Sequence, residues 1–144
     1  MTNALPEAGS VQRANLYAVT LERPVLALTC AIVGLGYVGL PTALSLCEAG
    51  SSVIGLDVDQ DRLRRIVEGD VDVSPRDRGR LHDAVAAADL QLTHDESALE
   101  RADVVIVCVP TPVDEHQVPD LTMLRAAAAS VVAHAVAGQL IVLT

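Results

Sequence analysis

The chain has 144 residues, which indicates one domain that is long enough to bury a hydrophobic core. Apolar residues make up 51% of it, which excludes a disordered chain. The formal net charge of −9 argues against nucleic acid as the main partner, because a phosphate backbone would be repelled.

Residues 1–24 show no hydrophobic period, and we expect a loose leader there, followed by a folded domain at residues 25–144. In that domain short apolar runs alternate with segments of helical pattern. The apolar runs predict strands at residues 27–33, 53–57, 90–93, 104–109 and 140–143. The intervening segments predict helices at residues 39–49, 61–68, 80–88 and 121–137, with one helical turn at residues 97–101.

This alternation of strands and helices predicts an α/β fold. Strands that are continuously apolar are typical of a parallel sheet buried on both faces. Right-handed crossovers then give a Rossmann-type doubly wound parallel sheet with the strand order 3-2-1-4-5. The sequence ends where such a sheet normally adds another helix and strand, so we expect a domain truncated before a sixth strand.

A glycine-rich turn joins the first predicted strand to the first predicted helix. Residues 34–39 read G-L-G-Y-V-G, which is the G-x-G-x-x-G spacing of dinucleotide-binding turns. In that context Gly34 makes the tight turn, Gly36 lets the backbone approach a pyrophosphate, and Gly39 lets the helix pack on the strand. The helix N-terminus adds free N–H groups and the positive end of its dipole. The spacing alone also fits an ordinary glycine-rich turn.

Asp57 distinguishes these two interpretations. It ends the second predicted strand, about 20 residues after the turn, where a carboxylate accepts both hydroxyls of an adenosine ribose. A 2′-phosphate would be repelled there, so the turn and the acid together predict an NAD site that discriminates against NADP. Asp59 and Asp61 are expected to be solvated residues or helix caps. Arg62 lies either beside the adenine or on an exposed helix face.

The fourth predicted strand runs into a stiff loop, since residues 106–113 read I-V-C-V-P-T-P-V. In a doubly wound sheet the ligand crevice lies where the strand order reverses, beyond the carboxyl ends of strands one and four. Pro110 and Pro112 fix φ and remove two donors, which leaves Thr111 on a rigid platform with a free N–H and hydroxyl. The loop suits packing against the nicotinamide end of the cofactor, although it also fits a stiff surface loop.

Together these motifs resemble the UDP-glucose/GDP-mannose dehydrogenase family of nucleotide-sugar dehydrogenases. The similar segments are G-L-G-Y-V-G-L-P, D-V-D-Q-D-R-L, A-D-V-V-I-V-C-V-P-T-P and V-P-D-L, and they fall within residues 28–144. The longer segment V-P-T-P-V-D-E-H-Q-V-P-D-L is more similar to the UDP-N-acetylhexosamine dehydrogenase branch than to the UDP-glucose branch.

The resemblance implies NAD contacts from the glycine turn, from the acid and arginine that follow it, and from the loop after the fourth strand. These residues are Gly34, Leu35, Gly36, Tyr37, Val38, Gly39, Asp57, Arg62, Val109, Pro110 and Thr111.

Members of this family oxidise the primary alcohol of a nucleotide sugar to a uronic acid, with two NAD and through a thioester on a cysteine. The resemblance implies that this cysteine lies downstream, in a G-x-C-x-P-K-D segment of a second nucleotide-binding domain. We therefore expect no catalytic residue in this chain, which would bind NAD but be inactive alone. For the full-length protein the resemblance implies a UDP-sugar or related nucleotide-sugar substrate, a homo-oligomer and a role in polysaccharide biosynthesis.

Two other interpretations stay open. The chain fits a stand-alone NAD-binding or sensing module without catalysis. It also fits the cofactor domain of a β-hydroxyacid or hydroxyacyl dehydrogenase, although the V-P-T-P segment argues against this. Coding sequence that continues with an S-T segment, and later with G-x-C-x-P-K-D, would favour the nucleotide-sugar enzyme.

Neither the cysteines nor the uncharged N-terminal stretch indicates a metal site or a membrane segment. Cys30, Cys47 and Cys108 lie in separate apolar runs without metal-ligand spacing, so we expect reduced core residues in a cytoplasmic protein. Residues 24–47 carry no charge, but glycines and a proline divide them into a strand-like half and a helix-like half.

Overall fold

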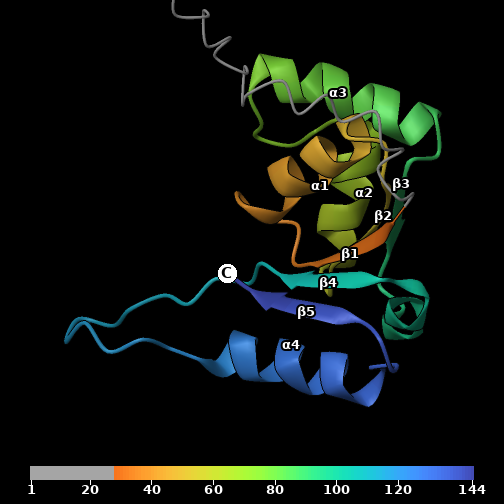
Figure 1. Cartoon of the computed structure of the whole chain (residues 1–144). Helices are drawn as coiled ribbons and strands as arrows, with labels where there is room; N and C mark the ends of the chain where they lie inside the picture. The colour runs from red at the N-terminus through yellow and green to blue at the C-terminus, as the bar shows by residue number, and fades with distance from the viewer. Residues whose placement is uncertain (1–27) are drawn as a thin grey trace, which may run out of the picture.

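Parallel strands form the centre of the molecule. The computed structural model describes residues 28–144, in which a five-stranded sheet has the order β3-β2-β1-β4-β5 (Figure 1). The strands are β1 (Thr29–Val33), β2 (Ser52–Leu56), β3 (Leu90–Thr93), β4 (Val104–Val107) and β5 (Leu140–Leu143). Each neighbouring pair is parallel, so the predicted α/β fold and strand order are confirmed. The expected leader at residues 1–24 lies outside the described residues.

Helices cover both faces of the sheet. They are α1 (Gly39–Glu48), α2 (Gln60–Glu68), α3 (Pro75–Ala86), the 3-10 helix η1 (Glu96–Arg101) and α4 (Thr122–Ala133). The first three lie on one face, and η1 and α4 lie on the other (Figure 1). Alternate residues of β1 serve the two cores: Ile32 packs with the α1 side, whereas Ala31 and Val33 pack with η1 and α4. Burial on both faces explains why the strands are nearly continuous apolar runs.

β1 lies between β2 and β4, and the three strands end at the same level. Val33 pairs with Leu56 of β2 and with Val107 of β4. The strand order reverses at this point, because the chain passes from β1 to β2 on one side and later returns to β4 on the other. The carboxyl ends of these strands therefore border the position where doubly wound sheets bind ligands.

α3 begins at Pro75, five residues before the predicted start at residue 80. The hydroxyl oxygen of Ser74 accepts the N–H of Asp77 at 3.1 Å and caps the helix. Pro75 occupies the first helical position, where its missing N–H is not needed. Residues 70–79 are polar and the sequence predicted no helix there, so the predicted helix start was wrong by residues 75–79.

α4 ends at Ala133, whereas the sequence predicted a helix to residue 137. The side-chain amide of Gln139 accepts the N–H of Val136 at 2.9 Å and donates to the carbonyls of Leu99 and Ala102 at 2.7 Å. These bonds hold the chain in a turn against η1, and they replace the hydrogen bonds that would have continued the helix.

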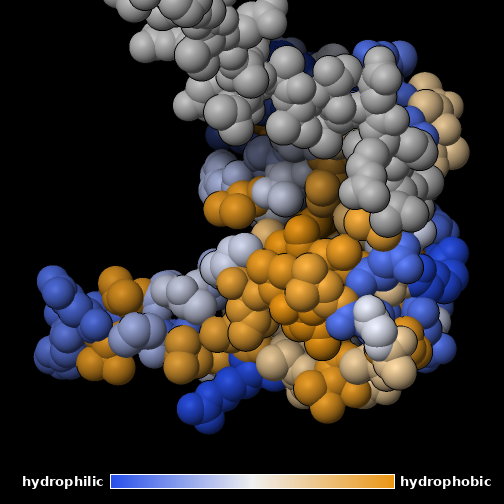
Figure 2. Space-filling view, in the orientation of Figure 1, coloured by the Kyte–Doolittle hydropathy of each residue, from blue (hydrophilic) through white to orange (hydrophobic). Residues whose placement is uncertain are grey.

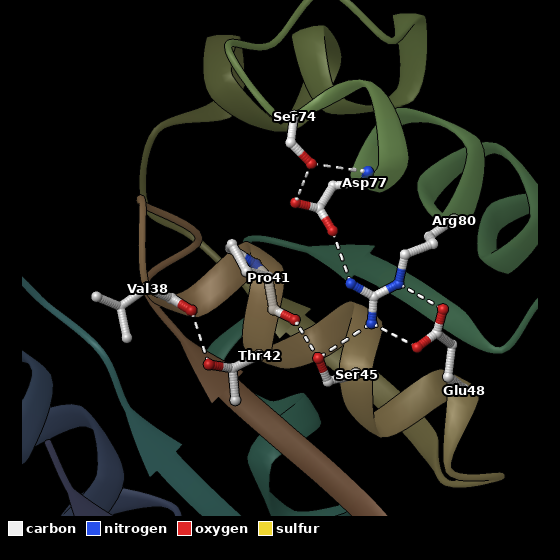
Figure 3. A network of polar contacts seen from close by, with 8 residues as sticks. All are labelled: Val38, Pro41, Thr42, Ser45, Glu48, Ser74, Asp77 and Arg80. Carbon is white, nitrogen blue, oxygen red and sulfur yellow. Dashed lines mark hydrogen bonds and ion pairs between the residues drawn. The ribbon is translucent and has the colours of Figure 1, made fainter.

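Arg80 joins α3 to α1 (Figure 3). Its guanidinium lies 2.6 Å from carboxylate oxygens of Glu48 and Asp77, and it donates to the hydroxyl of Ser45 at 3.0 Å. Asp77 also accepts the hydroxyl of Ser74 at 2.7 Å. The hydrogen bond from Ser74 and then that from Arg80 hold the pKa of the Asp77 carboxyl below its usual value. This network fixes the start of α3 against the helix that follows the glycine turn.

The segment between β4 and α4 projects from the body of the domain as an arm (Figure 1). Val113 and Pro119 form an isolated antiparallel bridge, and the carboxylate of Asp114 accepts the N–H groups of His116 and Val118 at 2.8 Å. Every residue from 110 to 121 is exposed. The arm is therefore ordered by its own hydrogen bonds.

β5 is an edge strand of the sheet, and it leaves apolar side chains exposed. Leu140, Ile141 and Leu143 are exposed, and Figure 2 shows apolar atoms gathered over β5. None of the helices within residues 28–144 is long and apolar enough to cross a bilayer.

Candidate functional site

A cavity of about 850 Å³ lies at the carboxyl ends of β1, β2 and β4. Small-molecule and cofactor sites usually have volumes of roughly 300–1,000 Å³. The wall of the cavity comes from the glycine turn, from the residues that follow β2 and β4, and from one face of α4. It therefore lies at the crevice that the strand order predicts.

The three glycines of the turn have different surroundings. Gly34 has a φ of +91°, and a Cβ atom there would lie 2.8 Å from the carbonyl oxygen of Cys108. A Cβ atom at Gly39 would lie 1.8 Å from the carbonyl oxygen of Gly34, so no side chain fits beneath the turn. A Cβ atom at Gly36 would meet nothing within 4 Å, and Gly36 lines the cavity. Two of these glycines are thus required by packing, and the third leaves the backbone open to a ligand.

Asp57 follows β2 directly and lines the cavity. One carboxylate oxygen accepts the N–H of Leu35 at 2.8 Å, and the other accepts the N–H of Asp59 at 2.9 Å. Each oxygen keeps a further lone pair for a ligand hydroxyl. The carboxylate is therefore held by the glycine turn on one side and by the residues just before α2 on the other. The sequence did not reveal that Asp57 links these two segments.

The start of α2 forms the next part of the wall. The carboxylate of Asp59 accepts the N–H groups of Asp61 and Arg62 at 3.0 and 3.1 Å, so Asp59 caps this helix as expected. Asp61 forms a surface ion pair with Arg64 at 2.9 Å. Arg62 is half-buried and lines the main cavity, and it also lines a neighbouring cavity of about 320 Å³. Arg62 thus borders the cavity, and its place beside the adenine stays a prediction.

The residues that follow β4 form the wall of the cavity on the other side from α2. Val109 and Pro110 line the cavity, and Val109 also packs on the core between the sheet and α4. Thr111 is exposed at the base of the arm and is not part of the lining. The two prolines thus hold the start of the arm at the rim of the cavity.

Most of the predicted site residues come together around this one cavity. The residues that line it are Gly34, Gly36, Tyr37, Val38, Asp57, Arg62, Val109 and Pro110. Leu35 is buried beneath the turn and lines the smaller cavity, and Gly39 is buried at the start of α1. Leu35 nevertheless contributes through its backbone N–H, which holds Asp57 in place.

One face of α4 completes the wall, and the sequence analysis did not identify it. Met123, Ala126, Ala127 and Ser130 all line the cavity. Their spacing of three, four and seven residues places them on one side of the helix. This spacing of small residues was visible in the alanine-rich segment, but it is common in helices that merely pack on a sheet.

Two of the described cysteines have thiols with a raised pKa. Burial raises the pKa of Cys47 to about 11, and burial likewise raises the pKa of Cys30. Cys108 is buried at the end of β4 and lines the cavity, where its sulfur lies 3.6 Å from the hydroxyl of Thr144. Within residues 28–144 no three His, Cys, Asp or Glu side chains are grouped as metal ligands.

These features fit a dinucleotide. The open backbone at Gly36 leaves space for a pyrophosphate next to the N-terminus of α1. Asp57 offers a fixed pair of acceptors directly after β2, the position of the acidic residue that binds a ribose in doubly wound folds. The remaining wall is mostly apolar, which suits the two aromatic bases.

Comparison with known proteins identifies a family for this domain. Residues 28–144 match the family model described as the UDP-glucose/GDP-mannose dehydrogenase family, NAD binding domain. The UDP-N-acetyl-D-glucosamine 6-dehydrogenase of Pseudomonas aeruginosa is 39% identical over 104 residues, which is 72% of this chain and 24% of that protein. The UDP-N-acetyl-D-mannosamine dehydrogenase of Methanocaldococcus jannaschii is 36% identical over 116 residues, covering 78% of this chain and 26% of that protein.

A solved structure shows the same fold. The UDP-D-ManNAc dehydrogenase of Pyrococcus horikoshii superposes with a TM-score of 0.75 and 31% identity, covering 81% of this chain and 28% of that one. The chain thus spans about a quarter of the length of these relatives. Their names agree with the resemblance to the UDP-N-acetylhexosamine branch. The chain belongs to the UDP-glucose/GDP-mannose dehydrogenase family, and its residues 28–144 are the NAD-binding domain of that family.

Proposed function

We propose that this chain is the NAD-binding domain of a nucleotide-sugar 6-dehydrogenase, an enzyme that oxidises the primary alcohol of the sugar to a uronic acid with two NAD. Support comes from the family match and from relatives that are named as dehydrogenases of UDP-N-acetylhexosamines. The observation that carries the proposal is the cavity, because it joins the glycine turn, Asp57 and the loop after β4 around one space.

The glycine turn holds the pyrophosphate in this proposal. Gly36 lets the backbone approach the phosphates, and the first N–H groups of α1 face them with the positive end of the helix dipole. Tyr37 and Val38 are 82% and 59% exposed at the mouth of the cavity, so they are available to cover the phosphates.

Asp57 selects the cofactor. Its carboxylate is anchored by two backbone N–H groups and accepts the hydroxyls of the adenosine ribose with its remaining lone pairs. A 2′-phosphate would bring a second negative charge to the same place, so NAD is preferred over NADP. Arg62 lies beside this position and borders the adenosine end.

Val109, Pro110 and Thr111 border the nicotinamide ribose. The prolines on either side of Thr111 restrict its backbone, so its N–H and hydroxyl are presented without a large loss of conformational entropy. When bound, NAD accepts a hydride from the carbon that is oxidised. This chain binds and orients the acceptor, and it shields one side of it from water.

A base and a nucleophilic thiol are also needed for oxidation of an alcohol to an acid. We assign neither role to a described residue. Cys47 has a raised pKa and lies within α1, and Cys30 is buried in β1. His116 lies on the exposed arm, and His134 contacts Glu100 at 3.0 Å, at the end of α4 remote from the crevice. We propose that both groups are supplied by sequence outside this domain.

Turnover assays test the proposal. The purified 144-residue chain should form no NADH above background from NAD and UDP-N-acetylglucosamine or UDP-N-acetylmannosamine. A protein of the length of the relatives, with this chain as its N-terminal part, should form two NADH for each sugar oxidised. Steady NADH production by the chain alone would overturn the assignment, and one NADH per sugar would refute oxidation to the uronic acid.

A further inference from the structure

The start of α1 is not held by a capping side chain. Val38 occupies the N-cap position and makes no side-chain hydrogen bond to the helix, and the first turn has no acidic residue. In many helices a cap accepts one of the free N–H groups of the first turn. In the proposed function those N–H groups face the pyrophosphate, so a cap would compete with the ligand. What fixes the first turn has to leave its N–H groups free.

Two hydroxyl groups of α1 hold the carbonyls of its first residues (Figure 3). The hydroxyl of Thr42 donates to the carbonyl oxygen of Val38 at 2.7 Å, and that of Ser45 donates to the carbonyl oxygen of Pro41 at 3.0 Å. Neither bond uses an N–H group. Ser45 is exposed, so water competes with Pro41 for its hydroxyl hydrogen. The bond to Pro41 therefore needs a second contact that directs the hydroxyl.

Arg80 of α3 supplies that contact. Its Nη2 donates to the hydroxyl oxygen of Ser45 at 3.0 Å, which leaves the hydroxyl hydrogen for Pro41. The Arg80 side chain is only 16% exposed, and Asp77 and Glu48 hold its guanidinium at 2.6 Å each. Asp77 also lines the smaller cavity together with residues of the glycine turn, so this network lies beside the turn. A planar guanidinium bonds all three partners at once, whereas a lysine ammonium acts as a point charge.

We propose that Arg80 and Ser45 are positioning residues for the binding of the pyrophosphate. The guanidinium acts through the Ser45 hydroxyl on the carbonyl of Pro41, and this keeps the first turn of α1 in the orientation in which its N–H groups meet the phosphates. Because the turn is ordered before the ligand arrives, less conformational entropy is lost on binding. Neither Arg80 nor Ser45 lines either cavity. The inference rests on the proposed binding of NAD, and it extends the site to a helix without a dinucleotide motif.

A double-mutant cycle tests this path. Ser45→Ala removes the hydroxyl and keeps the ion pairs of Arg80, whereas Arg80→Lys keeps a cation beside Asp77 and Glu48 but loses the planar guanidinium. Calorimetry with NADH should give about three- to tenfold weaker binding for each variant, as for the loss of one net hydrogen bond. Because both changes break the same path, the double variant should bind at most about twofold more weakly than Ser45→Ala.

Adenosine separates this role from a general loss of structure, because it lacks the phosphates. Its affinity is measured by NMR titration, well below the melting temperature of each variant, and should equal that of the unmodified chain in both variants. The matched controls are Ser52→Ala and Arg101→Lys. Ser52 is exposed at the start of β2, and Arg101 donates to Gln91 at 3.1 Å at the end of η1. Neither lines a cavity, so both controls should bind NADH like the unmodified chain.

Unchanged NADH affinity of Ser45→Ala would overturn the inference. Losses that add up in the double variant would also overturn it, because Arg80 would then not act through Ser45, and so would an equal loss of adenosine affinity. If Arg80→Lys does not fold, the comparison of Ser45→Ala with Ser52→Ala still decides. If the unmodified chain binds neither NADH nor adenosine, the proposed function fails and the inference fails with it.

Discussion

A valine at position 36 should block the cavity without unfolding the chain. A Cβ atom at Gly36 meets no other atom within 4 Å, and the backbone there does not need a positive φ. The free chain therefore has room for the side chain, and the substitution also reduces the entropy of the unfolded state. We expect the free energy of unfolding to change by no more than about 0.5 kcal/mol.

Binding of NADH should respond very differently. The isopropyl group would stand where the pyrophosphate lies against the backbone, and forcing extra atoms into a fitted space typically costs about 1–3 kcal/mol. Displacement of the phosphates also loses backbone hydrogen bonds to a charged group, worth about 1.5–3 kcal/mol. Together these losses correspond to binding that is at least about a hundredfold weaker.

Calorimetry with NADH measures the affinity, and circular dichroism with thermal unfolding measures the fold. Gly79→Val is the matched control, because a Cβ atom at Gly79 also meets nothing within 4 Å and this residue of α3 lines neither cavity. The control should bind NADH like the unmodified chain. If Gly36→Val binds NADH within threefold of the unmodified chain, the turn does not hold the pyrophosphate.

Gly39→Ala should behave in the opposite way and lower the free energy of unfolding by about 3 kcal/mol or more, measured by urea denaturation, because its Cβ atom would lie 1.8 Å from a backbone oxygen of the turn. Hydrogen bonds from Ser74 and then from Arg80 lower the pKa of the Asp77 carboxyl in the folded chain. These bonds stabilise the fold at pH values above the unfolded pKa of 3.8, and the stabilisation is lost as the pH falls through the lowered pKa. Ser74→Ala should therefore shrink the acid-induced loss of stability between pH 5 and pH 2, and an unchanged stability profile would contradict this. The Cys47 thiol has a pKa of about 11, so only about one molecule in a thousand should carry the thiolate at pH 8. Iodoacetamide should therefore modify Cys47 far more slowly in the folded chain than in urea, and mass spectrometry measures the rate of modification.

The sequence predicted the sheet well because strands buried on both faces show a strong pattern. Residues 104–107, for example, are all β-branched, and they form β4, which lies between β1 and β5 in the sheet. The helix ends were harder, since they depend on single hydrogen bonds. Ser74 and Pro75 have the residue types of a helix cap and a first helical position, but the charged residues that follow them are equally common in loops. The end of α4 depends on Gln139, whose partners on η1 lie about 40 residues away in the chain.

In the candidate site, too, the residues of a local motif were predictable and the contacts between distant segments were not. The glycine turn and Asp57 follow a known spacing, so their positions were predictable. The bond from the Leu35 N–H to the carboxylate of Asp57 was not, because it depends on how β1 and β2 align. The contribution of α4 depends on tertiary packing, and neither Ala126 nor Ser130 belongs to a motif.

Calorimetric titration with NADH and NADPH tests the central claim most directly. Asp57 should give the unmodified chain a clear preference for NADH, and Asp57→Ala should lose about ten- to a hundredfold in NADH affinity, as expected for hydrogen bonds to a charged group worth about 1.5–3 kcal/mol. The variant should also be less stable by about 1–3 kcal/mol, because the N–H of Leu35 loses its partner. Equal affinity of the unmodified chain for NADH and NADPH would contradict the assignment of Asp57 to the adenosine ribose.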